Sequence, residues 1–254
     1  MQDAHNEIVD RQFGPRAQAY VASAAHSSGP DLERLEAIAR ERPGARVLDL
    51  GCGGGHASYR VAPHVGQVVA CDLSADMITA VGAEAARRGL ANVSTKQAAA
   101  EDLPFADGAF DMLVCRLSAH HWQDLDGGLG EARRVLKPGA VAVIIDVVSP
   151  AHPACDTHLQ AVELLRDPSH VRDYRVEEWC TALARAGFYL ERSATHELRM
   201  GFASWVERMR TPQHHVDAIR SLQVAASSQV RRAFAIAEDG SFTIRVATFE
   251  LRPT

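Results

Sequence analysis

The sequence predicts an α/β fold, a doubly wound and mostly parallel sheet of seven strands with a helical cap. Between residues 46 and 147, short apolar runs alternate with helical segments, which is the pattern of a parallel sheet with right-handed crossovers. The run over 140–147 is apolar at nearly every position, as expected of a strand that is buried on both faces. A glycine-rich segment directly after the first run permits a sharp turn between strand and helix.

Each element is predicted from its hydrophobic period and from the residues that begin or end it. Asp31 opens the first core helix, which Pro43 and Gly44 end, while Ser74 is the expected cap of a later helix that Gly89 stops. Strands are expected over residues 46–50, 67–71, 93–97, 110–115, 140–147, 188–193 and 242–251. Further helices are expected over residues 130–136, 156–166 and 177–186 and over most of 202–236.

Three parts are expected along the chain. Residues 1–30 are polar and rich in alanine, and they form an N-terminal arm or lid. Residues 31–150 carry the alternating pattern and form the ligand-binding α/β domain. Residues 151–254 are expected to form a helical cap and to add the last strands to the same sheet.

Composition bounds the function classes. The 254 residues are 46% hydrophobic and 23% charged with a net charge of −5, which argues against a disordered chain, a fibre or a nucleic-acid-binding protein. The five cysteines form no C-x-x-C pair, and the first residues contain no apolar signal region, so a reducing, cytoplasmic location is expected. No membrane span and no metal site are expected, and the oligomeric state stays open.

The glycine-rich turn over residues 47–56 is the most informative segment. Ligands of an open parallel sheet bind beyond the C-terminal ends of its strands. Gly51 and Gly53 fit the start of a dinucleotide fingerprint, but His56 stands where that fingerprint needs its last glycine. Asp49 precedes the first glycine by two residues, where a carboxylate opposes a pyrophosphate and suits an ammonium group.

A second carboxylate, Asp72, ends the second predicted strand. A carboxylate at that place accepts hydrogen bonds from both hydroxyls of a ribose. An adenosine with a zwitterionic tail and no phosphate satisfies both Asp49 and Asp72. The residues therefore predict S-adenosylmethionine as the cofactor, with S-adenosylhomocysteine as its product.

Several further motifs follow in a fixed order over residues 45–145. They are D-x-G-x-G-x-G at 49–55, Cys71-Asp72-Leu73-Ser74, Ala-Glu-Asp-Leu-Pro-Phe at 100–105, Phe110-Asp111, and Arg-Val-Leu-Lys-Pro-Gly at 134–139. The series resembles the class I S-adenosylmethionine-dependent methyltransferases, and more narrowly their type 11 branch of UbiE-like and YcgJ-like members. Residues 116–122 and 166–172 extend the similarity to the YcgJ-like proteins.

The resemblance implies a Rossmann-like fold and a set of cofactor contacts. Asp49 and the glycines of the turn would hold the methionine end, Asp72 the ribose, and the backbone of Arg116 would face the methionyl part. Ala99 stands where many relatives have Asp, so Glu101 would compensate at the adenine edge. The expected cofactor-binding residues are Asp49, Gly51, Cys52, Gly53, Asp72, Leu73, Met77, Ala100, Glu101, Arg116 and Tyr20.

His121 is the candidate catalytic residue, because it follows the fourth strand and a histidine can accept a proton near neutral pH. The alternative is a polar loop residue that contacts Trp122. Phe13 and Tyr20 are candidates for a lid whose aromatic faces attract a sulfonium. The alternative for these two is simple helix packing.

The function that these observations predict is methyl transfer from S-adenosylmethionine to a small-molecule acceptor, by in-line displacement with a possible histidine base. Two alternatives stay open at this point. One is a non-catalytic S-adenosylmethionine-binding or regulatory protein, and the other is a nicotinamide-dependent oxidoreductase. The sequence does not name the acceptor or its reacting atom.

Overall fold

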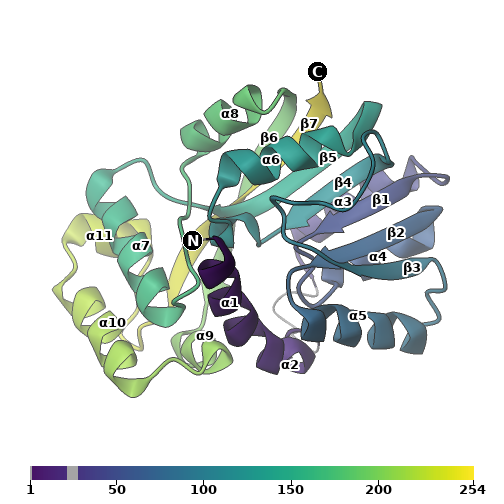
Figure 1. Cartoon of the computed structure of the whole chain (residues 1–254). Helices are drawn as coiled ribbons and strands as arrows, with labels where there is room; N and C mark the ends of the chain where they lie inside the picture. The colour runs from purple at the N-terminus through teal and green to yellow at the C-terminus, as the bar shows by residue number, and fades with distance from the viewer. Residues whose placement is uncertain (1, 22–27) are drawn as a thin grey trace.

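The computed structural model describes residues 2–21 and 28–254. These residues form one seven-stranded sheet in the order β3-β2-β1-β4-β5-β7-β6 (Figure 1). Residues 1 and 22–27 of the expected arm lie outside the described residues. The strands are β1 (Arg46–Leu50), β2 (Gln67–Asp72), β3 (Val93–Gln97), β4 (Phe110–Arg116), β5 (Leu136–Val148), β6 (Phe188–Met200) and β7 (Phe242–Pro253).

The sheet is parallel through β3, β2, β1, β4 and β5, and the last two strands join it antiparallel. The chain first builds outward from β1 through β2 to β3, and then returns to place β4 on the other side of β1. The strand order therefore reverses between β1 and β4, which is where an open α/β sheet binds its ligands. The prediction of a doubly wound, mostly parallel sheet of seven strands is confirmed.

Helices cover both faces of the sheet. On one face, α6 (Leu125–Arg134) and α8 (Val176–Arg185) pack Leu129 and Trp179 against the buried residues of β4, β5 and β7. On the other face, α3 (Pro30–Arg40) and α4 (His56–Val61) bury Leu35 and Val61 against β1 and β5. Because both faces are covered, the buried positions of the central strands are mostly apolar, with Asp49 of β1 and Asp146 of β5 as buried exceptions.

The cap gathers at one end of the sheet, where β7 passes beneath it (Figure 1). Its core joins Leu159, Trp205, Ile219 and Val230 to Phe242 of β7. The helices are α7 (Pro153–Arg166), α9 (Phe202–Met209), α10 (Gln213–Ala225) and α11 (Ser228–Ala233).

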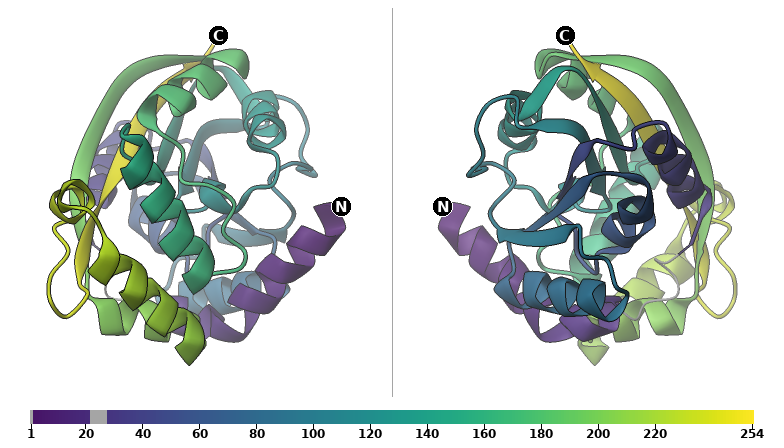
Figure 2. Two further views of the ribbon diagram at one scale, coloured as in Figure 1. Left: turned by 90° about the vertical axis from the view of Figure 1, so that its left-hand side faces the viewer. Right: turned by 90° about the vertical axis from the view of Figure 1, so that its right-hand side faces the viewer.

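The N-terminal arm comprises α1 (Gln2–Phe13), a 3₁₀ turn η1 (Gly14–Arg16) and α2 (Ala17–Val21). Its residues Ala17 and Val21 are buried against Met77 and Ala80 of α5 (Ala75–Arg87). Figure 2 shows α1 on the side of the molecule opposite β6. The arm thus lies beside the part of the sheet where the strand order reverses.

Some local predictions differ from the structure. Ser74 holds the predicted N-cap position of α5, but its hydroxyl makes no capping bond, and its backbone N–H donates to Asp72. The helix expected over residues 130–136 is α6, which begins at Leu125 and ends at Arg134. The strand expected over 140–147 is β5, which begins earlier, at Leu136, and its pairing with β4 shifts in register between Phe110 and Met112.

Candidate active site

The glycine-rich turn leads from β1 into α4 and forms the floor of a cavity. Gly51, Gly53 and Gly55 have φ of +67°, +48° and +78°, in the left-handed region that side chains disfavour. At Gly54 the constraint is space, because a Cβ there would lie 2.6 Å from the Tyr20 carbonyl oxygen. The turn therefore needs glycine for its own conformation and for the close approach of the arm.

Gly51→Ala is expected to lower the free energy of unfolding by about 1–2 kcal/mol for the left-handed backbone alone. A further loss is expected because the new Cβ would lie 1.9 Å from the Ser118 hydroxyl oxygen, which must move. Denaturant unfolding of the ligand-free protein measures the loss. Gly53→Ala is the matched control, since nothing lies within 4 Å of its Cβ position and only the backbone cost remains. Equal losses in the two variants would contradict the steric argument.

Asp49 points one oxygen at α4 and leaves the other without a partner. Its Oδ2 accepts hydrogen bonds from the backbone N–H and the hydroxyl of Ser58, at 2.9 and 2.7 Å. Its Oδ1 is buried and has no hydrogen-bond partner among the described residues. Burial raises the pKa of Asp49 to about 6, against the two bonds from Ser58. A buried carboxylate oxygen of this kind fits a cation such as an ammonium group.

Asp72 lies at the end of β2 beside the same turn. Its two oxygens accept the backbone N–H groups of Gly53 at 2.8 Å and Ser74 at 3.0 Å. Burial raises its pKa, although both of these bonds favour the charged form. Each carboxylate oxygen retains a further lone pair for a ligand hydroxyl.

All twelve residues predicted from the sequence line one cavity, which encloses about 1040 Å³ when its open mouth is included. They come from the arm, β1 and the turn after it, the end of β2, α5, the segment after β3, and the end of β4 with the turn that follows it. Sequence reasoning also named Phe13 as a lid candidate and Ala99 at the adenine edge, and it did not name the other members of the wall as site residues. These are Asn6, Val9, Leu50, Gly54, His56, Ala57, Ala98, Leu117, Ser118 and Trp122.

Cys52 lies in the turn as a buried thiol. Burial raises its pKa well above the usual value, so it is protonated at neutral pH. A protonated, buried thiol is a poor nucleophile, which agrees with a role as a small wall residue.

At the end of β4, Arg116 is held by a residue that the sequence suggested only as a helix start. Its Nε donates to Asp31 Oδ2 of α3 at 2.5 Å, and both side chains are at least nine-tenths buried. Leu117 follows with a φ of +52°, which is strained for a residue other than glycine. Leu117 and Arg116 both line the cavity.

His121 ends η4 (Ala119–His121), the short turn after β4. Its Nδ1 lies 3.1 Å from the Ser169 carbonyl oxygen, and because a carbonyl only accepts, Nδ1 carries the proton and Nε2 does not. Burial, and then the charge on His120, lowers the pKa of His121 to about 4. The ring is therefore uncharged at neutral pH. The Phe13 ring packs edge-on against it, with ring centres 5.0 Å apart.

Hydrogen bonds hold the N-terminal arm to α9 and to α4. The Tyr20 hydroxyl donates to Met209 Sδ at 3.1 Å, and Arg16 Nη2 donates to the Met209 carbonyl at 2.8 Å. On the floor of the cavity, His56 Nε2 donates to the Tyr20 carbonyl at 2.9 Å. Tyr20 and Phe13 also contact each other, with ring centres 5.4 Å apart. The arm thus forms one wall of the cavity and contacts both α9 and the glycine-rich turn.

Comparison with known proteins agrees with this geometry. Residues 48–144, which span β1 to β5, match the family described as "Methyltransferase domain". The uncharacterised methyltransferase YcgJ of Bacillus subtilis is 31% identical over 224 residues, which are 88% of each chain. The chain belongs to the S-adenosylmethionine-dependent methyltransferases. The crystal structure of YcgJ superposes with a TM-score of 0.84, covering 88% of this chain and 97% of that one.

Two other relatives of this methyltransferase cover most of its length. Uncharacterized protein YafE of Escherichia coli K12 is 49% identical over 189 residues, 74% of this chain and 91% of the relative. Nocamycin O-methyltransferase of Saccharothrix syringae is 29% identical over 283 residues, 95% of this chain and 98% of the relative. The family assignment, with S-adenosylmethionine as cofactor, overrides the nicotinamide-dependent and non-catalytic alternatives. Among the described residues, no helix is long and apolar enough to span a membrane.

The affinity of the methyltransferase for S-adenosylhomocysteine is expected to fall as the pH drops below about 6. The amino group of the ligand needs an ionised Asp49, whose pKa of about 6 in the free protein means that the carboxyl gains a proton below that value. Affinity should be constant above that range and fall by up to about tenfold per pH unit below it. Calorimetric titration between about pH 5 and pH 8 measures the curve. Asp49→Asn should bind more weakly with a flatter profile, and a wild-type profile without a fall would contradict the contact.

Proposed function

We propose that this enzyme transfers a methyl group from S-adenosylmethionine to a hydroxyl group of an uncharged small molecule. The observation that carries the proposal is a single cavity. It joins an unpartnered Asp49 oxygen to an uncharged His121, whose Nδ1 is protonated and whose Nε2 is not. When bound, the cofactor supplies an electrophilic methyl group on a positively charged sulfur.

The chain's own residues bind and orient the cofactor. Asp49 Oδ1 would accept the ammonium group, and the two Asp72 oxygens would accept the ribose hydroxyls. Gly51, Cys52 and Gly53 would offer their backbone to the methionine end. Arg116 would face that end with its backbone while Asp31 neutralises its side chain. The adenine ring would lie among Leu73, Met77, Ala100 and Glu101.

His121 would take the proton of the acceptor hydroxyl at its Nε2. As the new carbon–oxygen bond forms, that proton becomes strongly acidic, so even a weakly basic imidazole accepts it. An uncharged ring also avoids repelling the sulfonium, which a protonated histidine would do. The Ser169 carbonyl holds the ring through Nδ1 while the proton moves.

The charge of the cavity wall favours an uncharged acceptor. The arm contributes Asn6, Val9, Phe13 and Tyr20, none of which is charged. Among the described residues that line the cavity, Arg116 is the one lysine or arginine, and Asp31 offsets its charge. Beyond the cofactor contacts, the described wall residues therefore offer an acceptor no unpaired lysine or arginine that would attract a phosphate or a carboxylate. The O-methyltransferase among the relatives supports a hydroxyl as the methylated group.

The test is the formation of S-adenosylhomocysteine with pairs of acceptors that differ in one charged group. Uncharged phenols and enols are expected to turn over, while their carboxylated or phosphorylated counterparts react at least about tenfold more slowly. A thermal-shift measurement with S-adenosylmethionine and S-adenosylhomocysteine comes first. A ligand at 100 times its dissociation constant stabilises the folded protein by about 2.7 kcal/mol. Turnover confined to anionic acceptors or to RNA would contradict the proposed acceptor class.

A further inference from the structure

Asp146 is a buried carboxylate that the proposed reaction leaves without a role. It interrupts the apolar run of β5 and has no exposed surface. Its Oδ1 accepts His120 Nδ1–H at 2.6 Å and the Val147 N–H at 2.8 Å, and its Oδ2 accepts the His120 backbone N–H at 3.2 Å. Three donors therefore satisfy this buried carboxyl group, and the closest of them is a side chain that can carry a positive charge. That side chain is its ion-pair partner.

His120 is that partner. Burial lowers the pKa of His120, but the Asp146 carboxylate, with smaller contributions from Asp173 and Glu163, outweighs burial and raises that pKa to about 9. The ring is therefore positively charged at neutral pH. Its centre lies 4.2 Å from the centre of the His121 ring. A fixed positive charge at that distance opposes protonation of His121.

Ser169 acts on the other side of the His121 ring. Its carbonyl and its hydroxyl oxygen lie 3.1 and 3.3 Å from His121 Nδ1. The Ser169 hydroxyl donates to Asp167 Oδ1 at 2.6 Å, which leaves its lone pairs for the imidazole N–H. Both oxygens thus accept from Nδ1, and the proton is kept off Nε2.

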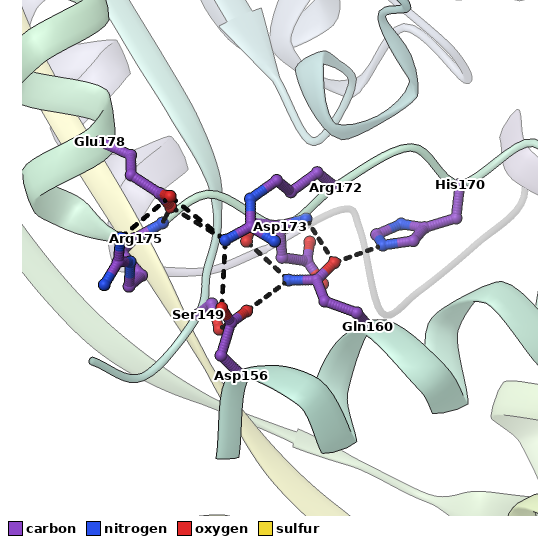
Figure 3. A network of polar contacts seen from close by, with 8 residues as sticks. All are labelled: Ser149, Asp156, Gln160, His170, Arg172, Asp173, Arg175 and Glu178. Carbon is purple, nitrogen blue, oxygen red and sulfur yellow. Dashed lines mark hydrogen bonds and ion pairs between the residues drawn. The ribbon is translucent and has the colours of Figure 1, made fainter. Parts of the chain in front are cut away.

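Hydrogen bonds and ion pairs to α7 and α8 hold the segment that carries Ser169 (Figure 3). Gln160 of α7 accepts the Asp173 N–H at 3.0 Å and donates to the Asp173 carbonyl at 2.8 Å. His170 Nε2 lies 3.0 Å from the Gln160 oxygen, and Arg172 bridges Asp156 of α7 to Glu178 of α8. The backbone N–H groups of Val171 and Arg172 also donate to the His120 carbonyl, at 2.9 and 3.2 Å, so the segment over 167–175 is bonded to η4 as well.

The titratable groups around His121 come from every element packed against it. His120 lies beside it on η4, Asp146 lies on β5, and Asp167 and His170 lie on the segment over 167–175. His5 of α1 donates to the His121 carbonyl at 2.9 Å. Burial, and then His120 and His121, lowers the pKa of His170 to about 2, so that ring is uncharged. His120 is accordingly the adjacent positive charge.

We propose that His120, Asp146 and Ser169 are positioning residues that hold His121 uncharged, with its proton on Nδ1 and a lone pair on Nε2. The ion pair of His120 with Asp146 sets the charge beside the ring, and Ser169 selects the tautomer. The inference rests on the proposed function of His121 as proton acceptor. The state of the ring is nevertheless measurable without an acceptor.

The first test is ¹⁵N NMR of the histidine rings in the wild-type protein, with and without S-adenosylhomocysteine. His121 is expected to carry its proton on Nδ1 and to stay uncharged at neutral pH. His120 should be fully protonated in the same spectra. A proton on Nε2 of His121, or an uncharged His120, would overturn the proposal without any variant.

Two variants test the cause. In His120→Gln the side-chain amide can still donate to Asp146, but the positive charge is gone, so the measured pKa of His121 should rise by about one pH unit or more. In Asp146→Asn both the carboxylate and the charge on His120 are lost, so the rise should be smaller. His214→Gln is the control, since His214 forms another adjacent pair with His215, at 4.5 Å, in α10. An unchanged His121 pKa in His120→Gln would refute the role of His120.

Activity separates this proposal from the function on which it rests. With an accepted substrate, the acid limb of the plot of kcat against pH should move to higher pH in His120→Gln. The move should equal the rise in the His121 pKa measured by NMR. A merely structural defect would lower kcat without moving that limb. If the NMR shift occurs but His121→Ala retains full turnover, the positioning stands and the base role fails.

Discussion

Asp72→Ala is expected to weaken S-adenosylmethionine binding by about 10²–10⁴-fold. The two oxygens of Asp72 would each accept a ribose hydroxyl, and hydrogen bonds to a charged group contribute about 1.5–3 kcal/mol each. Their sum of about 3–6 kcal/mol converts to that range at about 1.4 kcal/mol per tenfold. Calorimetry with S-adenosylhomocysteine measures the loss directly, because binding needs no acceptor.

The variant also removes the acceptors of the Gly53 and Ser74 N–H groups, so the turn itself could loosen. Asp72→Asn keeps the shape and one acceptor oxygen, and its loss of affinity should lie between wild type and alanine. Asp76→Ala serves as the control, because Asp76 is exposed in the first turn of α5 and does not line the cavity. Unchanged affinity in Asp72→Ala would show that the ribose binds elsewhere.

The residues predicted to bind the cofactor line one cavity, because most of them are brought together locally. Asp49 and the glycines belong to one turn, and Asp72 ends the neighbouring strand. The parallel pairing of β1 with β2 brings such residues together at one edge of the sheet. Strand ends and glycines can be recognised in a single sequence, so the residues that meet at this edge of the sheet can be predicted from them.

The rest of the site depends on pairings between distant residues, and sequence reasoning missed these pairings. Asp31 looks like a helix start, yet it neutralises Arg116 on β4. Asp146 looks like a flaw in an apolar strand, yet it carries the charge that His120 needs. Ser169 lies in a segment that carries the family resemblance, yet its sequence gives no sign of its partner, because its carbonyl reaches His121 only through the packing of distant elements. The hydrophobic period of a helix or strand shows which of its faces is buried, but it does not show which distant residue pairs with a buried polar group.

His121→Ala is expected to lower kcat by about 10²–10⁴-fold, the usual contribution of a positioned proton acceptor. Affinity for S-adenosylhomocysteine should stay nearly intact, because the proposed cofactor contacts are made by Asp49 of β1 and Asp72 of β2. His214→Ala is the matched control, an exposed histidine in the cap whose loss should leave both quantities unchanged. Added imidazole should restore part of the turnover, since the vacated space accepts the missing base. A variant that loses cofactor affinity in step with turnover would instead make His121 a wall of the binding site, and the proton would then leave the acceptor by another route.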